Sequence, residues 1–142
     1  MSLYNVFNVA GSGMSAQSIR LNTTASNLAN ADSVSSSVDE TYKARHPVFA
    51  AELKRAQTAT GEMGESAKVQ VLGIVESDKP LTVEYSPNHP MADENGFIYK
   101  SNVNVMEEMA NMISASRSYQ TNVQVADAAK QMISRTLRLG QQ

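Results

Sequence analysis

The chain has 142 residues, enough for one domain, and a formal net charge of −2 from 12 basic and 14 acidic side chains. This near balance, without a run of Lys or Arg, argues against a protein that binds nucleic acid or an anionic membrane surface electrostatically. Cysteine is absent, which excludes disulfides and thiolate metal sites, and only 18% of the residues are charged against a usual share of about 25%.

The sequence gives no indication of a cleaved secretory signal or of a membrane span. The first cation is Arg20, whereas a signal peptide needs basic residues ahead of its apolar run. No uninterrupted apolar run reaches the roughly 18 residues that a spanning helix requires. We therefore expect a soluble chain without membrane insertion, or one that leaves the cytosol by a route that reads no cleaved signal.

Residues 1–31 are predicted to form a helix over Leu3–Ala29. Apolar side chains recur there in alternating steps of four and three residues, the spacing of a coiled-coil seam. The intrinsic helix preference is poor, because twelve of the 29 residues from Ser2 to Asn30 are Ser, Thr or Asn and two more are Gly. The summed helix propensities make a helix of this segment about 8 kcal/mol less stable than an alanine helix of the same length. We expect it to be mostly unfolded alone, so that packing partners must stabilise it.

The same segment is almost uncharged. Arg20 is the single charged residue among the first 31, whereas a solvated helix normally carries charges on its outer face. A helix of small, uncharged residues is better suited to close burial on several sides.

Residues 32–102 are predicted to form a small β-rich insertion. Turn residues rich in Ser, Pro, Asn and Gly separate three strand-like stretches, Val69–Glu76, Leu81–Tyr85 and Gly96–Tyr99. Ser33–Ser37 and Gly61–Ser66 are expected to be loops. With few large apolar side chains, this insertion has at most a marginal core of its own.

Residues 103–142 are predicted to form a second and more favourable helix over Val105–Leu139. Asn104 is expected to be its N-cap, with Glu107 as the capping-box partner. Gly140 is expected just beyond its C-terminal end. Apolar residues again recur in alternating steps of four and three. The predicted fold is therefore mainly α with a small β-rich insertion, its two long terminal helices pairing as the coiled-coil-like core of an elongated subunit.

No constellation of side chains predicts catalysis or the binding of a metal or cofactor. His46 and His89 each precede Pro and lack a second ligand at metal-binding spacing. The adjacent acids Asp39–Glu40 and Asp93–Glu94 lie in polar segments, where carboxylates are solvated rather than tuned as acid and base. Gly11-Ser12-Gly13 lacks the preceding strand and the Lys of a phosphate-binding loop. We expect no metal, no cofactor and no enzymatic activity.

Two terminal stretches carry a family signature. The first is Gly11-Ser12-Gly13-Met14-Ser15-Ala16-Gln17 followed by Arg20-Leu21-Asn22-Thr23-Thr24-Ala25-Ser26-Asn27-Leu28-Ala29-Asn30-Ala31-Asp32. The second comprises His89–Asp93, Gly96–Tyr99, Asn102–Met109 and Ala115–Asn122. Together they resemble the bacterial flagellar rod and hook protein family, and the second stretch and the length are similar to its short proximal-rod members. Lys100-Ser101 departs from the aliphatic residue and Pro expected there.

The resemblance implies a structural subunit of the flagellar basal-body rod, a helical tube that crosses the periplasm and transmits torque. Such subunits are exported unfolded by the flagellar type III apparatus and assemble with copies of themselves and with other rod proteins. Their terminal helices form the inner tube. We therefore expect an assembly interface in which one set of side chains, Leu3, Phe7, Met14, Leu21 and Leu28, packs within and between subunits against a second, Met109, Met112, Tyr119, Val123, Ile133 and Leu137.

A short stretch of the insertion fits an export signal. Phe49-Ala50-Ala51-Glu52-Leu53 matches the Phe-x-x-x-hydrophobic pattern that the resemblance associates with engagement of the export gate. The alternative is that Phe49 and Leu53 are a packing pair of the i,i+4 type. Both interpretations stay open.

A cytosolic helical adaptor or secretion chaperone is the alternative function, since it would also carry paired amphipathic termini. Such a protein would form a small, stably helical oligomer. A rod subunit would instead show low helicity in dilute solution and become more helical on polymerisation.

Overall fold

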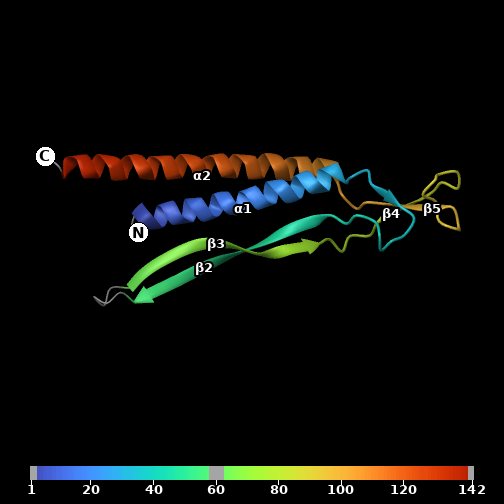
Figure 1. Ribbon diagram of the computed structural model, residues 1–142, viewed down its shortest axis with the longest axis horizontal. Helices are drawn as coiled ribbons and strands as arrows, with labels where there is room; N and C mark the ends of the chain where they lie inside the picture. The colour runs from blue at the N-terminus through green and yellow to red at the C-terminus, as the bar shows by residue number, and fades with distance from the viewer. Residues whose placement is uncertain (1–2, 58–62, 141–142) are drawn as a thin grey trace. The chain divides into compact units, whose positions relative to one another are not determined.

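A computed structural model of the chain describes residues 3–57 and 63–140, and both terminal helices lie where the sequence predicts them (Figure 1). Helix α1 spans Leu3–Ala29 and helix α2 spans Val105–Leu139. The strands between them along the chain are β1 (Val34–Ser35), β2 (Arg45–Gln57), β3 (Met63–Glu76), β4 (Thr82–Tyr85) and β5 (Phe97–Lys100). The structure confirms the expectation of a helix-rich chain with a β insertion between its two helices.

The chain divides into two compact units. The first unit consists of Met1–Ile19, Val48–Gly73 and Ala115–Gln142, and the second of Arg20–Pro47 and Ile74–Ser114. Helices α1 and α2 and strands β2 and β3 contribute residues to both. The predicted division into 1–31, 32–102 and 103–142 concerns the order of segments along the sequence and stays a prediction.

A three-stranded antiparallel sheet in the second unit has the order β1-β5-β4. Val83 lies opposite Tyr99, and Tyr85 lies opposite Phe97, with the rings of that last pair in an edge-on contact at 5.3 Å between centroids. The predicted strands at 81–85 and 96–99 are confirmed to within one residue. The expected loop at 33–37 is wrong in part, because Val34–Ser35 pairs with β5 as strand β1.

The turn before β5 is built by one acid and one glycine. Asp93 Oδ1 accepts hydrogen bonds from the backbone N–H groups of Asn95, at 2.9 Å, and Phe97, at 2.8 Å. Gly96 has a φ of 83°, and a Cβ there would lie 3.0 Å from the ring of Tyr85. Turn residues therefore separate β4 from β5 as predicted, and the Asp93 carboxylate is engaged by backbone groups of this turn.

Strands β2 and β3 form a separate two-stranded sheet. The predicted strand 69–76 is the C-terminal part of β3, but the loop predicted at 61–66 is wrong for residues 63–66, which belong to the strand. Residues 61 and 62 lie outside the described part. Strand β2 is not predicted by the sequence, because Ala50–Gln57 is rich in good helix formers. Pairing with β3 overrides that local preference.

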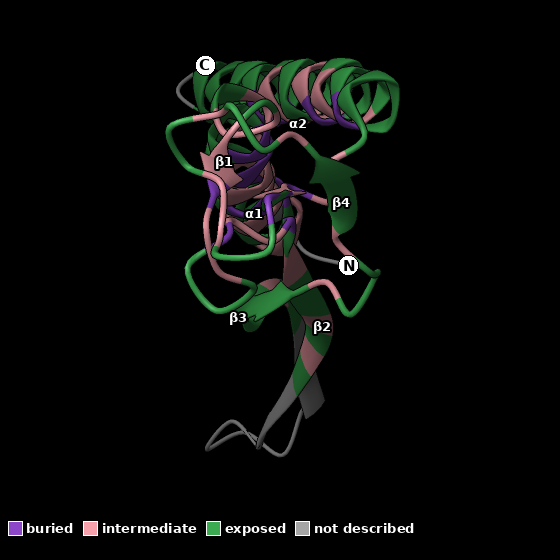
Figure 2. Ribbon diagram, turned by 90° about the vertical axis from the view of Figure 1, so that its right-hand side faces the viewer, coloured by how far each residue is buried: buried purple, intermediate pink, exposed green. Residues whose placement is uncertain are grey.

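The buried side chains are unusually small. Among the described residues, the buried apolar ones are Ile98 and six alanines, Ala10, Ala16, Ala44, Ala115, Ala126 and Ala129. Long stretches of α2 are exposed, with buried residues only at intervals (Figure 2). Because burial of a methyl group contributes far less than burial of a Leu or Phe side chain, this core supplies little hydrophobic stabilisation. The larger apolar side chains of the helices lie mostly outside it.

Candidate functional site

One buried asparagine joins three segments of the second unit. The Asn27 amide donates hydrogen bonds to the backbone oxygen of Arg45, at 2.8 Å, and to Glu108 Oε2, at 3.0 Å. Its oxygen accepts from the Arg45 N–H and from the Tyr42 hydroxyl, both at 2.9 Å. These four bonds use the full capacity of an amide side chain. Asn27 is 0% exposed and is the largest fully buried side chain among the described residues.

Glu108, the partner of Asn27 on α2, is itself only 3% exposed. Burying a carboxylate is costly unless hydrogen bonds and favourable dipoles compensate. Glu108 lies in the first turn of α2, where the helix dipole favours a negative charge, and it accepts from the Asn27 amide. The end of α1 and the beginning of α2 are thus joined by a polar pair within a protein interior.

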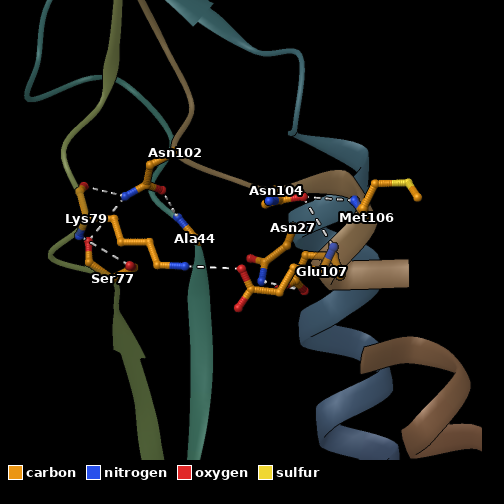
Figure 3. Close-up of polar contacts among 9 residues, drawn as sticks. Asn27, Ala44, Ser77, Lys79, Asn102, Asn104, Met106 and Glu107 are labelled. Atoms are coloured by element: carbon orange, nitrogen blue, oxygen red, sulfur yellow. Dashed lines mark hydrogen bonds and ion pairs between the residues drawn. The ribbon is translucent and has the colours of Figure 1, made fainter. Parts of the chain in front are cut away.

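A second asparagine joins the strand segments of the same unit (Figure 3). Asn102 Oδ1 accepts from the backbone N–H of Ala44 at 2.7 Å, and its amide donates to the backbone oxygens of Lys79, at 2.7 Å, and Ser77, at 3.4 Å. Like Asn27, Asn102 satisfies backbone groups with its side-chain amide, and those groups lie just outside strands β2 and β3. We call the contacts of Asn27 and Asn102 together the junction.

Helix α2 begins immediately after the junction, at the predicted cap. Asn104 Oδ1 accepts from the backbone N–H groups of Met106, at 3.0 Å, and Glu107, at 3.3 Å, as an N-cap does (Figure 3). The predicted capping-box role of Glu107 is wrong, because its carboxylate forms an exposed ion pair with Lys79 at 3.1 Å.

A row of small and polar residues of α1 contacts α2. In the second unit, Arg20 donates to Asn111 Oδ1 at 2.9 Å, and Asn27 donates to Glu108. In the first unit, a Cβ on Gly13 would lie 2.8 Å from the Asn122 amide nitrogen. Gly13, Arg20 and Asn27 follow one another at intervals of seven residues, and we call them the contact row.

Four of the large apolar residues of the predicted seam of α1 lie beside this contact row, whereas Ala10 and Thr24 of the same seam are buried. Phe7, Met14, Leu21 and Leu28, here called the apolar row, each stand one residue after a position of the contact row's heptad. One residue turns the direction of a side chain by about 100° around a helix. Phe7 is exposed and the other three are half-buried. The large apolar residues of the predicted seam are therefore half-buried or exposed in the single chain, and their role as packing residues stays a prediction.

The remaining predicted interface residues are largely accessible. On α2, Met112 and Val123 are half-buried and four others are exposed, namely Met109, Tyr119, Ile133 and Leu137. Leu3 is the first residue of α1, but its side chain lies outside the described part of the structure. As an assembly interface, this set stays a prediction.

The proposed export motif lies in a strand. Phe49 and Leu53 belong to β2, where both side chains are exposed. The interpretation of this pair as an i,i+4 contact is wrong, because residues four apart in a strand are separated by about 13 Å. What remains is a pair of accessible apolar side chains on one strand.

The acids and histidines have ordinary structural surroundings. Asp39 and Glu40 are exposed beside a polar cavity of about 380 Å³ in the second unit. His89 accepts a hydrogen bond from the Met91 N–H at Nδ1. Within 3–57 and 63–140, no three acidic or histidine side chains gather as metal ligands would. In the same ranges, neither helix is long and apolar enough to cross a membrane.

The junction is the feature that the sequence did not reveal. In the sequence, Asn27 and Glu108 stand out only as members of the two signature stretches. The available signal was the contact row itself, because polar residues at heptad spacing beside an apolar row indicate a second helix face. The partner of each residue is visible only in the structure.

Comparison with known proteins identifies the chain's family. Its residues 7–35 match the family model described as "Flagella basal body rod protein", and residues 94–139 match "Flagellar basal body rod FlgEFG protein C-terminal". The chain is 45% identical to the flagellar basal-body rod protein FlgC of Salmonella typhimurium and to that of Escherichia coli O157:H7, over 99% of this chain and 100% of each relative. It is 42% identical, with the same coverage, to FlgC of Buchnera aphidicola from Acyrthosiphon pisum. The chain therefore belongs to the FlgC family, the non-enzymatic structural rod subunits of the bacterial flagellar basal body.

Proposed function

We propose that the chain polymerises in the proximal rod through the large apolar side chains of its two terminal helices, and that the resulting tube transmits torque. One observation carries the proposal. Apart from Ile98, the buried side chains among the described residues are alanine or polar, while Met106 and Leu139 are each 76% exposed and Leu137 is 65% exposed. Exposed apolar side chains of this size favour an interface.

The energetics favour burial between subunits. Covering a Leu, Met or Phe side chain contributes about 1.5 to 3 kcal/mol. Each subunit offers several such side chains, from the apolar row and from the exposed residues of α2. Helix α1 also carries a single charge, Arg20, which donates to Asn111 on α2. Neighbouring subunits can therefore approach α1 without desolvating further charges.

The partners are copies of the chain and other rod proteins. Contacts between two different surface patches, repeated along a screw axis, produce an open helical tube rather than a closed ring. Knobs of apolar side chains packed between helices resist sliding, which is the property that torque transmission requires.

Export precedes this assembly in the proposal. A chain whose buried apolar residues are nearly all alanine unfolds at low energetic cost, as passage through a narrow type III channel requires. Phe49 and Leu53 would engage the export gate. In the unfolded chain both side chains are free of β2 and available to a receptor groove.

Replacing Phe49 with alanine is expected to reduce secretion of the chain several-fold while its cytosolic level stays unchanged. Phe49 lies outside the buried core, so its loss is expected to affect recognition of the export signal more than stability. Quantitative immunoblots of the culture supernatant and the cell pellet measure both amounts. Val48→Ala is the matched control, because Val48 is an equally accessible neighbour outside the motif. Unchanged secretion of the Phe49→Ala chain would remove the export role.

Polymerisation is tested by circular dichroism and light scattering over a concentration series of the purified chain. We expect helicity to rise together with particle size, because α1 gains stability from neighbouring subunits. A helicity that is already maximal in a small oligomer of fixed size, independent of concentration, would contradict the proposal and favour a helical adaptor.

A further inference from the structure

Apolar repeats leave the pairing of α1 and α2 ambiguous. Phe7, Met14, Leu21 and Leu28 recur every seven residues, so a shift of α1 by seven positions places one apolar side chain where another stood. The buried alanines Ala115, Ala126 and Ala129 of α2 are too alike to distinguish one alignment from another. Hydrophobic burial alone therefore does not fix how far α1 is displaced along α2.

The contact row has the same spacing but a different partner at every position. Gly13 lies against Asn122, Arg20 donates to Asn111, and Asn27 donates to Glu108. A shift of α1 by seven residues in one direction would bring Arg20 to the place of Asn27. A shift in the other direction would leave no residue of α1 at that place. A polar residue at one position of a helix seam is an established way of specifying register.

The Asn27–Glu108 contact is the most demanding of the three. Both side chains are buried, and Asn27 satisfies the N–H and the carbonyl of Arg45 in addition to Glu108. Displacement by one helical turn moves Asn27 by about 5.4 Å, beyond hydrogen-bonding distance of every partner. The buried carboxylate and the Arg45 backbone groups would then lack their bonds, at a cost of about 1 to 3 kcal/mol for each neutral group.

We propose that Asn27 and Glu108 are the positioning pair that sets the register of α1 on α2. The apolar residues of both helices provide surface for assembly. The positioning pair decides which apolar residues of α1 lie next to which apolar residues of α2. This consequence for assembly rests on the proposed function, whereas the register itself is a property of the single chain.

The absence of cysteine from the native sequence makes the register measurable. In the native register, Gly13→Cys and Asn122→Cys are within reach of a disulfide, since a Cβ on Gly13 lies 3.2 Å from Asn122 Cγ. A shift of α1 by seven residues would instead bring Gly13→Cys toward Ala115→Cys or Ala129→Cys. We call these two combinations the shifted pairs.

Three substitutions separate the hydrogen bond from general effects. Glu108→Leu removes the acceptor from a buried site, and Glu108→Gln keeps an acceptor of the same length. Glu107→Leu makes the same change at the neighbouring exposed acid. Each of the three substitutions is combined with each cysteine pair in the full chain. The variants are then oxidised at a concentration at which circular dichroism shows the chain to be helical.

With native Glu108, the 13–122 disulfide is expected to predominate. Glu108→Leu is expected to lower the ratio of this disulfide to the shifted pairs by on the order of tenfold, whereas Glu108→Gln and Glu107→Leu leave it near the native value. An unchanged ratio in the helical Glu108→Leu chain would overturn the proposal. So would a Glu108→Gln chain as disturbed as Glu108→Leu, or a native chain without the 13–122 disulfide.

Swimming assays distinguish this inference from the proposed function. Cells producing the Glu107→Leu or Glu108→Gln chain are expected to swim normally, and cells producing Glu108→Leu are expected to export the chain but not to swim. A shifted register together with normal swimming would leave the positioning pair intact and refute the link to assembly. Lost swimming with an unshifted register would refute the positioning role.

Discussion

Replacing Leu137 with aspartate is expected to abolish swimming while synthesis and secretion of the chain continue. Leu137 lies in the last turns of α2 and is 65% exposed in the single chain, so the substitution has little effect on the fold. In a polymer it would forfeit about 1.5 to 3 kcal/mol of apolar burial and place an unpaired carboxylate in the interface. Because the contact repeats at every subunit, the loss prevents growth of the rod. Motility in soft agar and the yield of isolated basal bodies measure the result.

Gln131→Asp is the control for Leu137→Asp. It adds the same charge to another exposed position in the C-terminal part of α2, but removes no apolar side chain. We expect its swimming to be close to normal. Leu21→Asp, within the apolar row, is expected to block assembly as well. Rod formation and swimming by cells with Leu137→Asp and Leu21→Asp chains would refute the interface.

The second large effect concerns Asn27. Asn27→Ala is expected to lower the free energy of unfolding by about 3 to 5 kcal/mol, or to remove the cooperative transition altogether. The truncation leaves Glu108, the Tyr42 hydroxyl and two backbone groups of Arg45 without their buried partner. In many proteins a loss of this size follows from truncating a buried Leu or Phe. Here we expect it from truncating a buried polar side chain.

Urea unfolding followed by circular dichroism measures this loss, with Asn30→Ala as the matched control. The Asn30 amide donates to the backbone oxygen of Ser26 near the surface, so its removal should cost less than about 1 kcal/mol. Equal unfolding midpoints for Asn27→Ala and Asn30→Ala would show that the buried bonds do not stabilise the chain.

Local sequence was sufficient for the elements whose signals lie within a few residues. The bounds of α1 and α2 follow from apolar spacing, a capping asparagine and a terminal glycine, all of which act over one or two helical turns. Strands β4 and β5 follow from alternation between turn residues. Strand β2 was missed because its sequence favours a helix when taken alone, and only pairing with β3 makes it a strand.

The sequence by itself determined that two long helices would exist, that α1 would be nearly uncharged, and that apolar side chains would line one face of each helix. Periodicity establishes these facts because it reports which residues share a face. Only the tertiary structure decided which residues of α2 the Gly13, Arg20 and Asn27 of α1 meet. The physical reason is that hydrophobicity marks surface worth burying without saying what covers it, whereas a close helix contact depends on small side chains and on hydrogen-bond partners far away in the sequence.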